Sequence, residues 1–283
     1  TGHPNSEPTR VGTSIGDITA GMFTAIGINA ALYDRQKTGK GAFIDVVFAY
    51  DPEKPVLRGV NFNIEPGQCI AVVGATGAGK STLINLLNRF YEIENGAIEI
   101  DDLDIRQMTL KGLRSHISVV LQDVFLFADT IEKNITLGNP NITLDTVIEA
   151  AKAIGVHEFI KALPGGYHFE INERGSTLSS GQRQLISFLR AYVANPSILV
   201  LDEATSSIDT YAEQLIQRAT EKITEGRTSI IIAHRLATVQ KADVILVMDL
   251  GQVVERGSHE ELLSKKGMYY QLYQAQFAEL SEA

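Results

Sequence analysis

Short apolar runs recur along the chain and predict buried β-strands between polar, glycine-rich connections. Residues 197–201 and 228–232 are continuous runs rich in Ile, Leu and Val, which is typical of parallel strands covered on both faces. Further strands are expected at residues 43–50, 61–64, 68–73, 97–100, 244–248 and 253–255. Gly251 and Gln252 would form the turn of the last hairpin.

Segments between these strands have the apolar spacing of helices. Helices are expected at residues 82–87, 147–153, 156–163 and 181–192, and from about residue 258 onward. Ahead of the first strand, residues 17–35 predict an Ala- and Gly-rich helix. The order of elements indicates an α/β fold with a mixed β-sheet core, an antiparallel β subdomain, a helical insertion at about 123–190 and a short N-terminal helical appendage.

Composition and charge narrow the class of protein. Of the 283 residues, 44% are hydrophobic and 21% charged, and the formal net charge of −9 argues against a nucleic-acid partner. The longest apolar stretch, residues 18–33, is interrupted by polar positions and falls short of the ~20 residues that span a bilayer. We see no secretory leader, so we expect a cytoplasmic protein. The single cysteine, Cys69, is expected as a small buried hydrophobe in a reducing compartment.

The clearest chemical motif is Gly-Ala-Thr-Gly-Ala-Gly-Lys-Ser at residues 74–81, which matches the phosphate-binding pattern G-x-x-x-x-G-K-[ST]. It stands between a predicted strand and a predicted helix, which is the context that the pattern requires. Backbone N–H groups would surround the phosphates, Lys80 would reach the β- and γ-phosphates, and Ser81 would bind Mg²⁺. The expected nucleotide contacts are Gly74, Ala75, Thr76, Gly77, Ala78, Gly79, Lys80, Ser81 and Thr82.

Two carboxylates, Asp202 and Glu203, follow the apolar run at 198–201. Ligands of parallel sheets bind beyond the carboxyl ends of the strands, so both side chains would project toward the nucleotide. Asp202 suits Mg²⁺ coordination, and Glu203 suits a general base that polarises the attacking water.

Residues 178–182, Leu-Ser-Ser-Gly-Gln, stand between the phosphate loop and Asp202 and resemble the signature motif of ATP-binding-cassette (ABC) ATPases. The resemblance covers residues 43–283 and implies roles for four further residues. Tyr50 looks like the aromatic that stacks on adenine, Gln122 like the glutamine that joins the core to the helical insertion and helps to bind Mg²⁺, Asp209 like the aspartate of the D-loop at 206–209, and His234 like the switch histidine that contacts the γ-phosphate.

Each of these residues also has a simpler structural interpretation. Tyr50 could be a packed strand tyrosine, Gln122 a surface amide at a strand end, and His234 a core histidine after an apolar strand. The joint order of the motifs favours the functional interpretation.

The resemblance further implies a head-to-tail homodimer or heterodimer with ATP and Mg²⁺ as cofactors. ATP would lie between the phosphate loop of one subunit and the signature of the other, whose contacts would be Ser179, Ser180, Gly181, Gln182 and Asp209. Glu203, His234 and Gln122 would be the catalytic residues. A lone subunit would then hold half of a site.

Two segments point to a subfamily. Residues 169–177 are similar to the charged segment with which exporters sense their transmembrane domains, and residues 259–273 resemble the end of a half-size exporter of the multidrug or lipid type. We therefore expect the ATPase domain of an exporter, at the cytoplasmic face of a membrane, with its transmembrane domains outside this sequence. The alternative is a soluble, non-transport ABC ATPase.

Residues 1–46 resemble a fragment of class III CoA-transferases, with Asp17 at the position of that family's nucleophilic aspartate. A CoA site needs the rest of a larger interlaced fold, so CoA binding is kept only as a remote alternative. The expected organisation is a CoA-transferase-like fragment at 1–42, which is not an independent domain, followed by an ABC ATPase domain at 43–283.

Overall fold

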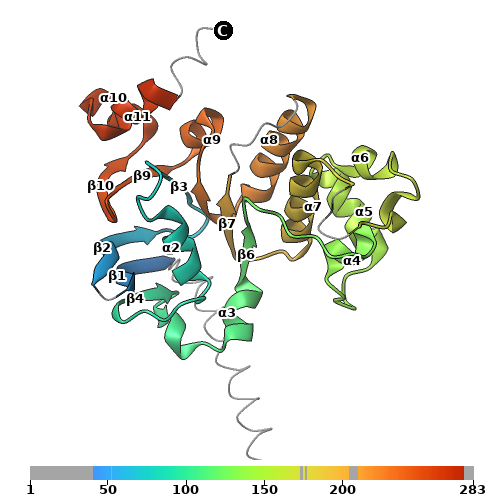
Figure 1. The fold of residues 1–283 in the computed structure, drawn as a ribbon, viewed down its shortest axis with the longest axis horizontal. Coiled ribbons are helices and arrows are strands. Elements are labelled where there is room, and N and C mark those ends of the chain that lie inside the picture. The colour runs from blue at the N-terminus through green and yellow to red at the C-terminus, as the bar shows by residue number, and fades with distance from the viewer. Residues whose placement is uncertain (1–40, 52, 173–174, 176, 204–209, 277–283) are drawn as a thin grey trace, which may run out of the picture.

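Two β-sheets and a lobe of helices form the computed structural model, which describes residues 41–51, 53–172, 175, 177–203 and 210–276. The predicted helix at 17–35, Asp17 and Asp209 lie outside these residues. Figure 1 shows the antiparallel sheet on one side of the molecule, the core sheet in the middle, and the helical lobe on the other side of that sheet. Among the described residues, no helix is long and apolar enough to cross a membrane.

The antiparallel sheet has four strands. In spatial order they are β2 (Lys54–Ile64), β1 (Ala42–Asp51), β4 (Asn95–Ile100) and β5 (Leu103–Asp104). Alternate side chains of β1, from Ala42 through Ile44 and Val46 to Phe48, are buried, as expected of a sheet with one face on the core. This face packs on the phosphate-loop helix in one hydrophobic cluster with one face of the core sheet.

The core sheet is parallel except for the edge strand β10 (Gln252–Gly257), which pairs antiparallel with β9 (Val244–Asp249). Its spatial order is β10, β9, β3 (Cys69–Gly74), β8 (Thr228–Ile232), β7 (Ile198–Asp202) and β6 (Ile117–Val120). All residues of β8 are buried. The carboxyl ends of β3, β8, β7 and β6 therefore meet at one edge of the sheet.

Ten α-helices and two 3₁₀ turns are described. They are α2 (Lys80–Leu87), η1 (Ile105–Gln107), α3 (Leu110–His116), α4 (Ile131–Thr136), α5 (Leu144–Ala153), α6 (His157–Lys161), η2 (Gly166–His168), α7 (Ser180–Val193), α8 (Thr210–Thr224), α9 (Leu236–Lys241), α10 (His259–Lys265) and α11 (Met268–Gln276). Figure 1 shows α4, α5, α6 and α7 together in the helical lobe.

The structure confirms the α/β fold, the antiparallel subdomain and the parallel core sheet, and it corrects several boundaries. The strand expected at 61–64 begins earlier, at Lys54. The last hairpin turns at Leu250 and Gly251, both with positive φ, and Gln252 already belongs to β10. The single C-terminal helix is two helices, because Lys266 adopts a left-handed conformation between them. The pattern of apolar positions in the sequence did not predict the strand β6 or the helices α3, α8 and α9.

Candidate functional site

The loop between β3 and α2 is shaped by glycines at two tight positions. Gly74 has φ 153°, and a Cβ there would lie 2.2 Å from the carbonyl oxygen of Met248 on the paired strand. Gly79 has φ 102°, and its Cβ would lie 2.7 Å from the side chain of Leu57. Residues with a side chain rarely adopt such φ values, so these two positions of the loop favour glycine. The chain thereby returns to helical geometry at Lys80, the first residue of α2.

Lys80 points back into this loop. Its Nζ donates hydrogen bonds to the carbonyl oxygens of Gly74 (2.7 Å) and Ala75 (3.0 Å), and the residue is only 8% exposed. Burial lowers the pKa of the ammonium, and the negative charge of Asp202 opposes that shift. Ser81 is exposed in the first turn of α2. The loop therefore presents a cation and a hydroxyl where phosphates and Mg²⁺ would bind.

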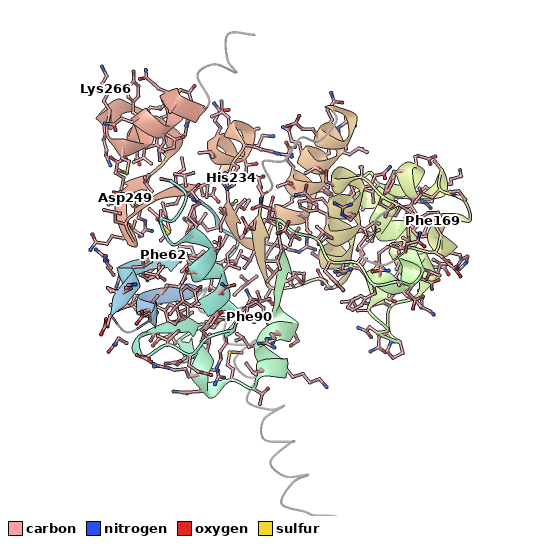
Figure 2. All side chains as sticks on the ribbon, viewed as in Figure 1. Phe62, Phe90, Phe169, His234, Asp249 and Lys266 are labelled. Carbon is pink, nitrogen blue, oxygen red and sulfur yellow. The ribbon has the colours of Figure 1, made fainter. Side chains whose placement is uncertain are left out.

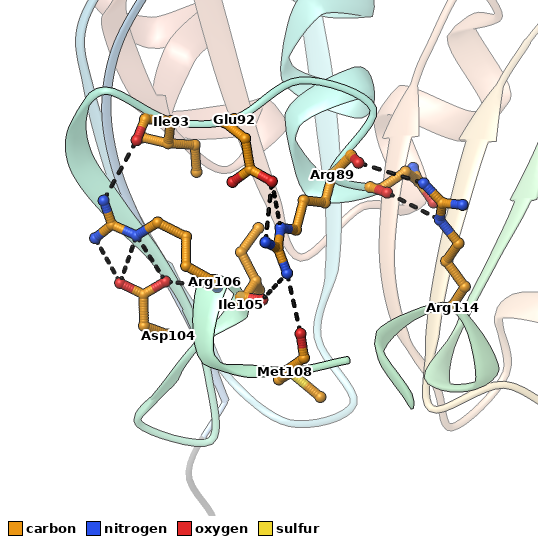
Figure 3. A network of polar contacts seen from close by, with 9 residues as sticks. Arg89, Glu92, Ile93, Asp104, Ile105, Arg106, Met108 and Arg114 are labelled. Carbon is orange, nitrogen blue, oxygen red and sulfur yellow. Dashed lines mark hydrogen bonds and ion pairs between the residues drawn. The ribbon is translucent and has the colours of Figure 1, made fainter. Parts of the chain in front are cut away.

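The other end of α2 is held by a network of arginines (Figure 3). Arg114 donates to the carbonyl oxygens of Asn88 and Arg89, both at 3.3 Å, just past the end of the helix. Arg89 in turn donates to the carbonyl oxygens of Ile105 (3.3 Å) and Met108 (3.0 Å). Cations at a helix C-terminus satisfy its free carbonyls and complement its dipole. The phosphate-loop helix is thus anchored at its far end.

Glu203 lies at the carboxyl edge of the core sheet, against the start of α9. Its carboxylate is 4% exposed and accepts the backbone N–H of His234 (3.2 Å) and of Arg235 (3.3 Å) on one oxygen and the hydroxyl of Thr238 (2.6 Å) on the other. Burial raises the pKa of Glu203, and these hydrogen bonds and Arg235 oppose the shift. The preceding residue, Asp202, ends β7 beside Ile232 of β8.

Charges from α2, from the end of β7 and from the segment after β6 meet near Asp202. Burial raises its pKa, the neighbouring Lys80 lowers it, and Asp123 raises it further. Burial also lowers the pKa of His234, as does the positive charge of Lys80. Figure 2 shows His234 close to α9. The structure therefore brings the phosphate loop, Asp202, Glu203 and His234 to one edge of the sheet.

Gln122 reaches the same edge because β6, which ends at Val120, runs parallel to β7. The Gln122 side chain is exposed. Asp123, the next residue, is close enough to affect Asp202 and was not predicted. Its signal in the sequence is its place directly after Gln122.

Tyr50, near the end of β1, is 48% exposed. Its ring lies edge-on to Phe48 and to Tyr91, each at 4.9 Å between centroids. Its hydroxyl is 3.3 Å from the hydroxyl of Thr82 on α2. Three aromatic rings thus cluster at this end of β1, near Thr82 of α2, and sequence reasoning missed Tyr91.

The signature residues lie elsewhere, at the start of α7 in the helical lobe. Ser179 caps this helix: its hydroxyl accepts the N–H of Gln182 (3.2 Å), and the Gln182 side chain accepts the N–H of Ser179 (2.9 Å). Ser179 stays exposed, whereas Gly181 is buried. Within the described part of the chain, neither residue of this cap hydrogen-bonds to the phosphate loop. The signature and the phosphate loop of one chain thus lie on different elements, at the start of α7 in the helical lobe and at the start of α2 beside the antiparallel sheet.

The donors at the sheet edge are oxygen atoms of different kinds. In the ranges that the structure describes, no group of three or more His, Cys, Asp or Glu could hold a metal by itself. Mg²⁺ is commonly bound by one or two carboxylates together with phosphates and waters. A site made of the Ser81 hydroxyl, the Gln122 amide oxygen and the Asp202 carboxylate fits that description, provided that a nucleotide completes it.

This arrangement of a phosphate loop and carboxylates at one sheet edge is compatible with nucleotide hydrolysis, and comparison with known proteins gives the family. Residues 57–206, more than half of the chain, match the ABC transporter family. The chain therefore belongs to the ABC transporter family and carries its ATP-binding, ATP-hydrolysing domain. Residues 1–51 match CoA-transferase family III.

Similar proteins place this domain among those of exporters. The fatty acid ABC transporter ATP-binding/permease protein of Mycobacterium bovis is 51% identical over 84% of this chain and 38% of its own length. The ATP-dependent lipid A-core flippase of Saccharophagus degradans is 48% identical over 85% of this chain and 41% of its own length. A bacterial Atm1-family ABC exporter with ATP bound matches with a TM-score of 0.78 and 42% identity over 84% of this chain and 42% of that chain. The chain spans about two fifths of the length of these relatives.

Proposed function

We propose that this chain hydrolyses MgATP in a composite site and that hydrolysis drives export through transmembrane partners. Tyr50 stacks on adenine, the loop from Gly74 to Thr82 holds the phosphates, and Ser81, Gln122 and Asp202 hold Mg²⁺. Glu203 accepts a proton from the attacking water, and His234 contacts the γ-phosphate. Mg²⁺ would neutralise phosphate charge and orient the β- and γ-phosphates.

One observation carries the proposal: Lys80, the adjacent pair Asp202 and Glu203, and His234 come from three distant parts of the sequence and meet at a single sheet edge. A ring N–H of His234 can donate a hydrogen bond to a phosphate oxygen. The buried carboxylate of Glu203 has a raised pKa, which makes it a stronger base toward water. The Lys80 ammonium of the phosphate loop would stabilise the negative charge on the phosphate oxygens during hydrolysis.

A second subunit would complete the site. The exposed Ser179 hydroxyl accepts from Gln182 within its cap, and its own proton remains available to donate to a phosphate. The N-terminus of α7, which begins at Ser180, would direct its positive end to the same anion. We therefore propose a head-to-tail dimer in which Ser179, Ser180, Gly181, Gln182 and Asp209 of one subunit face the ATP of the other.

Transmembrane domains are the partners that the fused ATP-binding/permease relative suggests. Exposed apolar side chains directly after β6 support this proposal: Leu121 is 44%, Phe125 57% and Phe127 53% exposed. Apolar side chains exposed together mark protein interaction sites. They flank Gln122, so a partner docked on them would be close to the metal site.

We also propose that the ABC ATPase domain begins at about residue 43 and that residues 1–42 are not an independent domain. The strand β1 supports this boundary, because it lies between β2 and β4. The CoA-transferase match extends to residue 51 and so includes β1, but β1 pairs with strands that lie outside that match. Limited proteolysis should cut ahead of residue 42 and leave a fragment that still hydrolyses ATP, whereas a fragment cut within β1 should lose activity.

Kinetics of the full chain test the site. Lys80→Ala should weaken binding of a fluorescent ATP analogue at least tenfold, because it removes the cation that contacts the phosphates. Glu203→Gln should bind the analogue normally, hydrolyse ATP at least a hundredfold more slowly, and form a dimer with ATP in size-exclusion chromatography. Lys133→Ala and Glu149→Gln are matched controls, since both side chains are exposed and each forms an ion pair with a residue three or four positions away. A Glu203→Gln variant with the wild-type rate would refute the assignment of the base.

The concentration dependence of the rate tests the dimer. At low protein concentration, the initial rate should rise more steeply than linearly, because two subunits must associate. A strictly linear rate at all concentrations, with a single sedimenting monomer in the Glu203→Gln variant, would rule out the composite site.

A further inference from the structure

The closest contact on the Glu203 carboxylate comes from a side chain, not from the backbone. Thr238 donates its hydroxyl proton to one carboxylate oxygen at 2.6 Å, whereas the N–H groups of His234 and Arg235 reach the other oxygen at 3.2 and 3.3 Å. Hydrogen bonds to a charged acceptor are about twice as strong as neutral ones. Thr238 thus makes the shortest hydrogen bond to this group.

The position of Thr238 is set by the packing of α9. The next residue, Val239, is fully buried in the core, and α9 begins right after the two residues whose N–H groups bind Glu203. The Thr238 side chain also lines a cavity of about 220 Å³ together with Cys69, Thr220 and Lys241. Loss of the hydroxyl would therefore remove the side-chain donor that Glu203 has at this oxygen.

Several charged or titratable groups surround the carboxylate. Arg235, which caps the start of α9, contributes a positive charge, and the negative charge of Glu203 raises the pKa of the Cys69 thiol on β3. None of these groups forms a hydrogen bond to the Oε1 atom within the described ranges, where Thr238 is its partner. The orientation of Oε1 thus depends on one hydroxyl.

We propose that Thr238 is a positioning residue, which holds the Glu203 carboxylate in the orientation that polarises the attacking water. This inference rests on the proposed role of Glu203. As water attacks, its oxygen bonds to the γ-phosphorus, its proton passes to a free lone pair of Glu203, and the bond to the β-phosphate oxygen breaks to release ADP and phosphate. The Thr238 proton stays on its hydroxyl throughout. Thr238 acts before this step, by preventing the carboxylate from rotating.

Removal of the hydroxyl at constant shape tests this role. In Thr238→Val, kcat for ATP should fall about tenfold, as expected for one lost hydrogen bond to a charged group. The KM for ATP should stay within about twofold, because the Thr238 hydroxyl binds Glu203 and is not among the proposed nucleotide contacts. Thr238→Ser restores the hydroxyl and should recover most of the rate. A Thr238→Val variant with wild-type kcat, or a Thr238→Ser variant as slow as Thr238→Val, would overturn the proposal.

A matched control separates positioning from general damage. Thr220 lines the same cavity, and its hydroxyl donates to the carbonyl oxygen of Ile216 at 2.9 Å. Thr220→Val therefore loses a buried threonine hydroxyl without touching Glu203, and its kcat should equal that of the wild type. If both valine variants lower kcat and raise KM alike, the role of Thr238 is structural only and the proposal fails.

A double variant distinguishes this proposal from the assignment of the base. Adding Thr238→Val to Glu203→Gln should leave the residual rate unchanged, because the group that Thr238 orients is already inactive. A further tenfold loss in the double variant would show that Thr238 acts independently of Glu203. If instead Glu203→Gln alone keeps the wild-type rate, the proposed base is wrong and Thr238 has no catalytic group to position.

Discussion

The side chain of Asn134 in α4 binds the loop that contains the exposed Phe127, and its contribution to the stability of the chain can be measured. The residue is 1% exposed, and its side chain binds the preceding loop from both ends of the amide. Its oxygen accepts the N–H of Phe127 at 2.8 Å, and its nitrogen donates to the carbonyl oxygens of Phe127 (3.0 Å), Thr130 (3.1 Å) and Asp129 (3.4 Å). The Asn134 amide thus binds backbone groups of this loop that would otherwise be paired by a helix or a strand.

Asn134→Ala should destabilise the chain by about 2–3 kcal/mol. A typical hydrogen bond contributes about 1 kcal/mol net, and a buried group left without a partner costs about 1–3 kcal/mol. The loop groups are partly exposed, so water can satisfy some of them, which keeps the estimate below the sum of four bonds. For a domain of this size, this free energy corresponds to a Tm lower by roughly 5–10 °C.

Urea denaturation and thermal melting of the full chain measure the effect. Asn139→Ala is the matched control, because the Asn139 side chain is exposed and accepts a single backbone N–H from Asn141. The control should unfold within about 0.5 kcal/mol of the wild type. If Asn134→Ala unfolds at the same urea midpoint as the control, the four contacts do not stabilise the loop and the reasoning is refuted.

Two further predictions concern the strand and the loop that precede α2. Burial raises the pKa of Cys69 to about 12. Iodoacetamide at pH 8 should therefore alkylate the native chain roughly a thousandfold more slowly than the urea-unfolded chain. Similar alkylation rates for the two chains would contradict the raised pKa. Gly77 and Gly79 both have positive φ, but an added Cβ meets nothing within 4 Å at Gly77 and lies 2.7 Å from Leu57 at Gly79. Gly79→Ala should therefore lower the unfolding free energy by about 1 kcal/mol more than Gly77→Ala, and equal urea midpoints would show that Leu57 moves aside freely.

Local sequence pattern was sufficient for most of the core sheet. The runs at 197–201, 228–232 and 244–248 became β7, β8 and β9 with shifts of one residue or none, because strands buried on both faces need apolar side chains at every position. The phosphate loop was equally predictable, since Gly79 and Lys80 have fixed positions in it. Elements with mixed patterns were missed: β6 has four residues and only two of them buried.

Tertiary structure decided which residues act together. The order of motifs in the sequence implied that Asp202, Glu203 and His234 serve one nucleotide, and the parallel pairing of β7 with β8 puts them at one edge. No local pattern could show that Thr238 holds Glu203, that Asp123 lies near Asp202 or that Tyr91 supports Tyr50, because each contact joins elements that are distant in sequence. Strand and loop identities follow from short-range sterics and burial, whereas side-chain partners depend on how the whole chain packs.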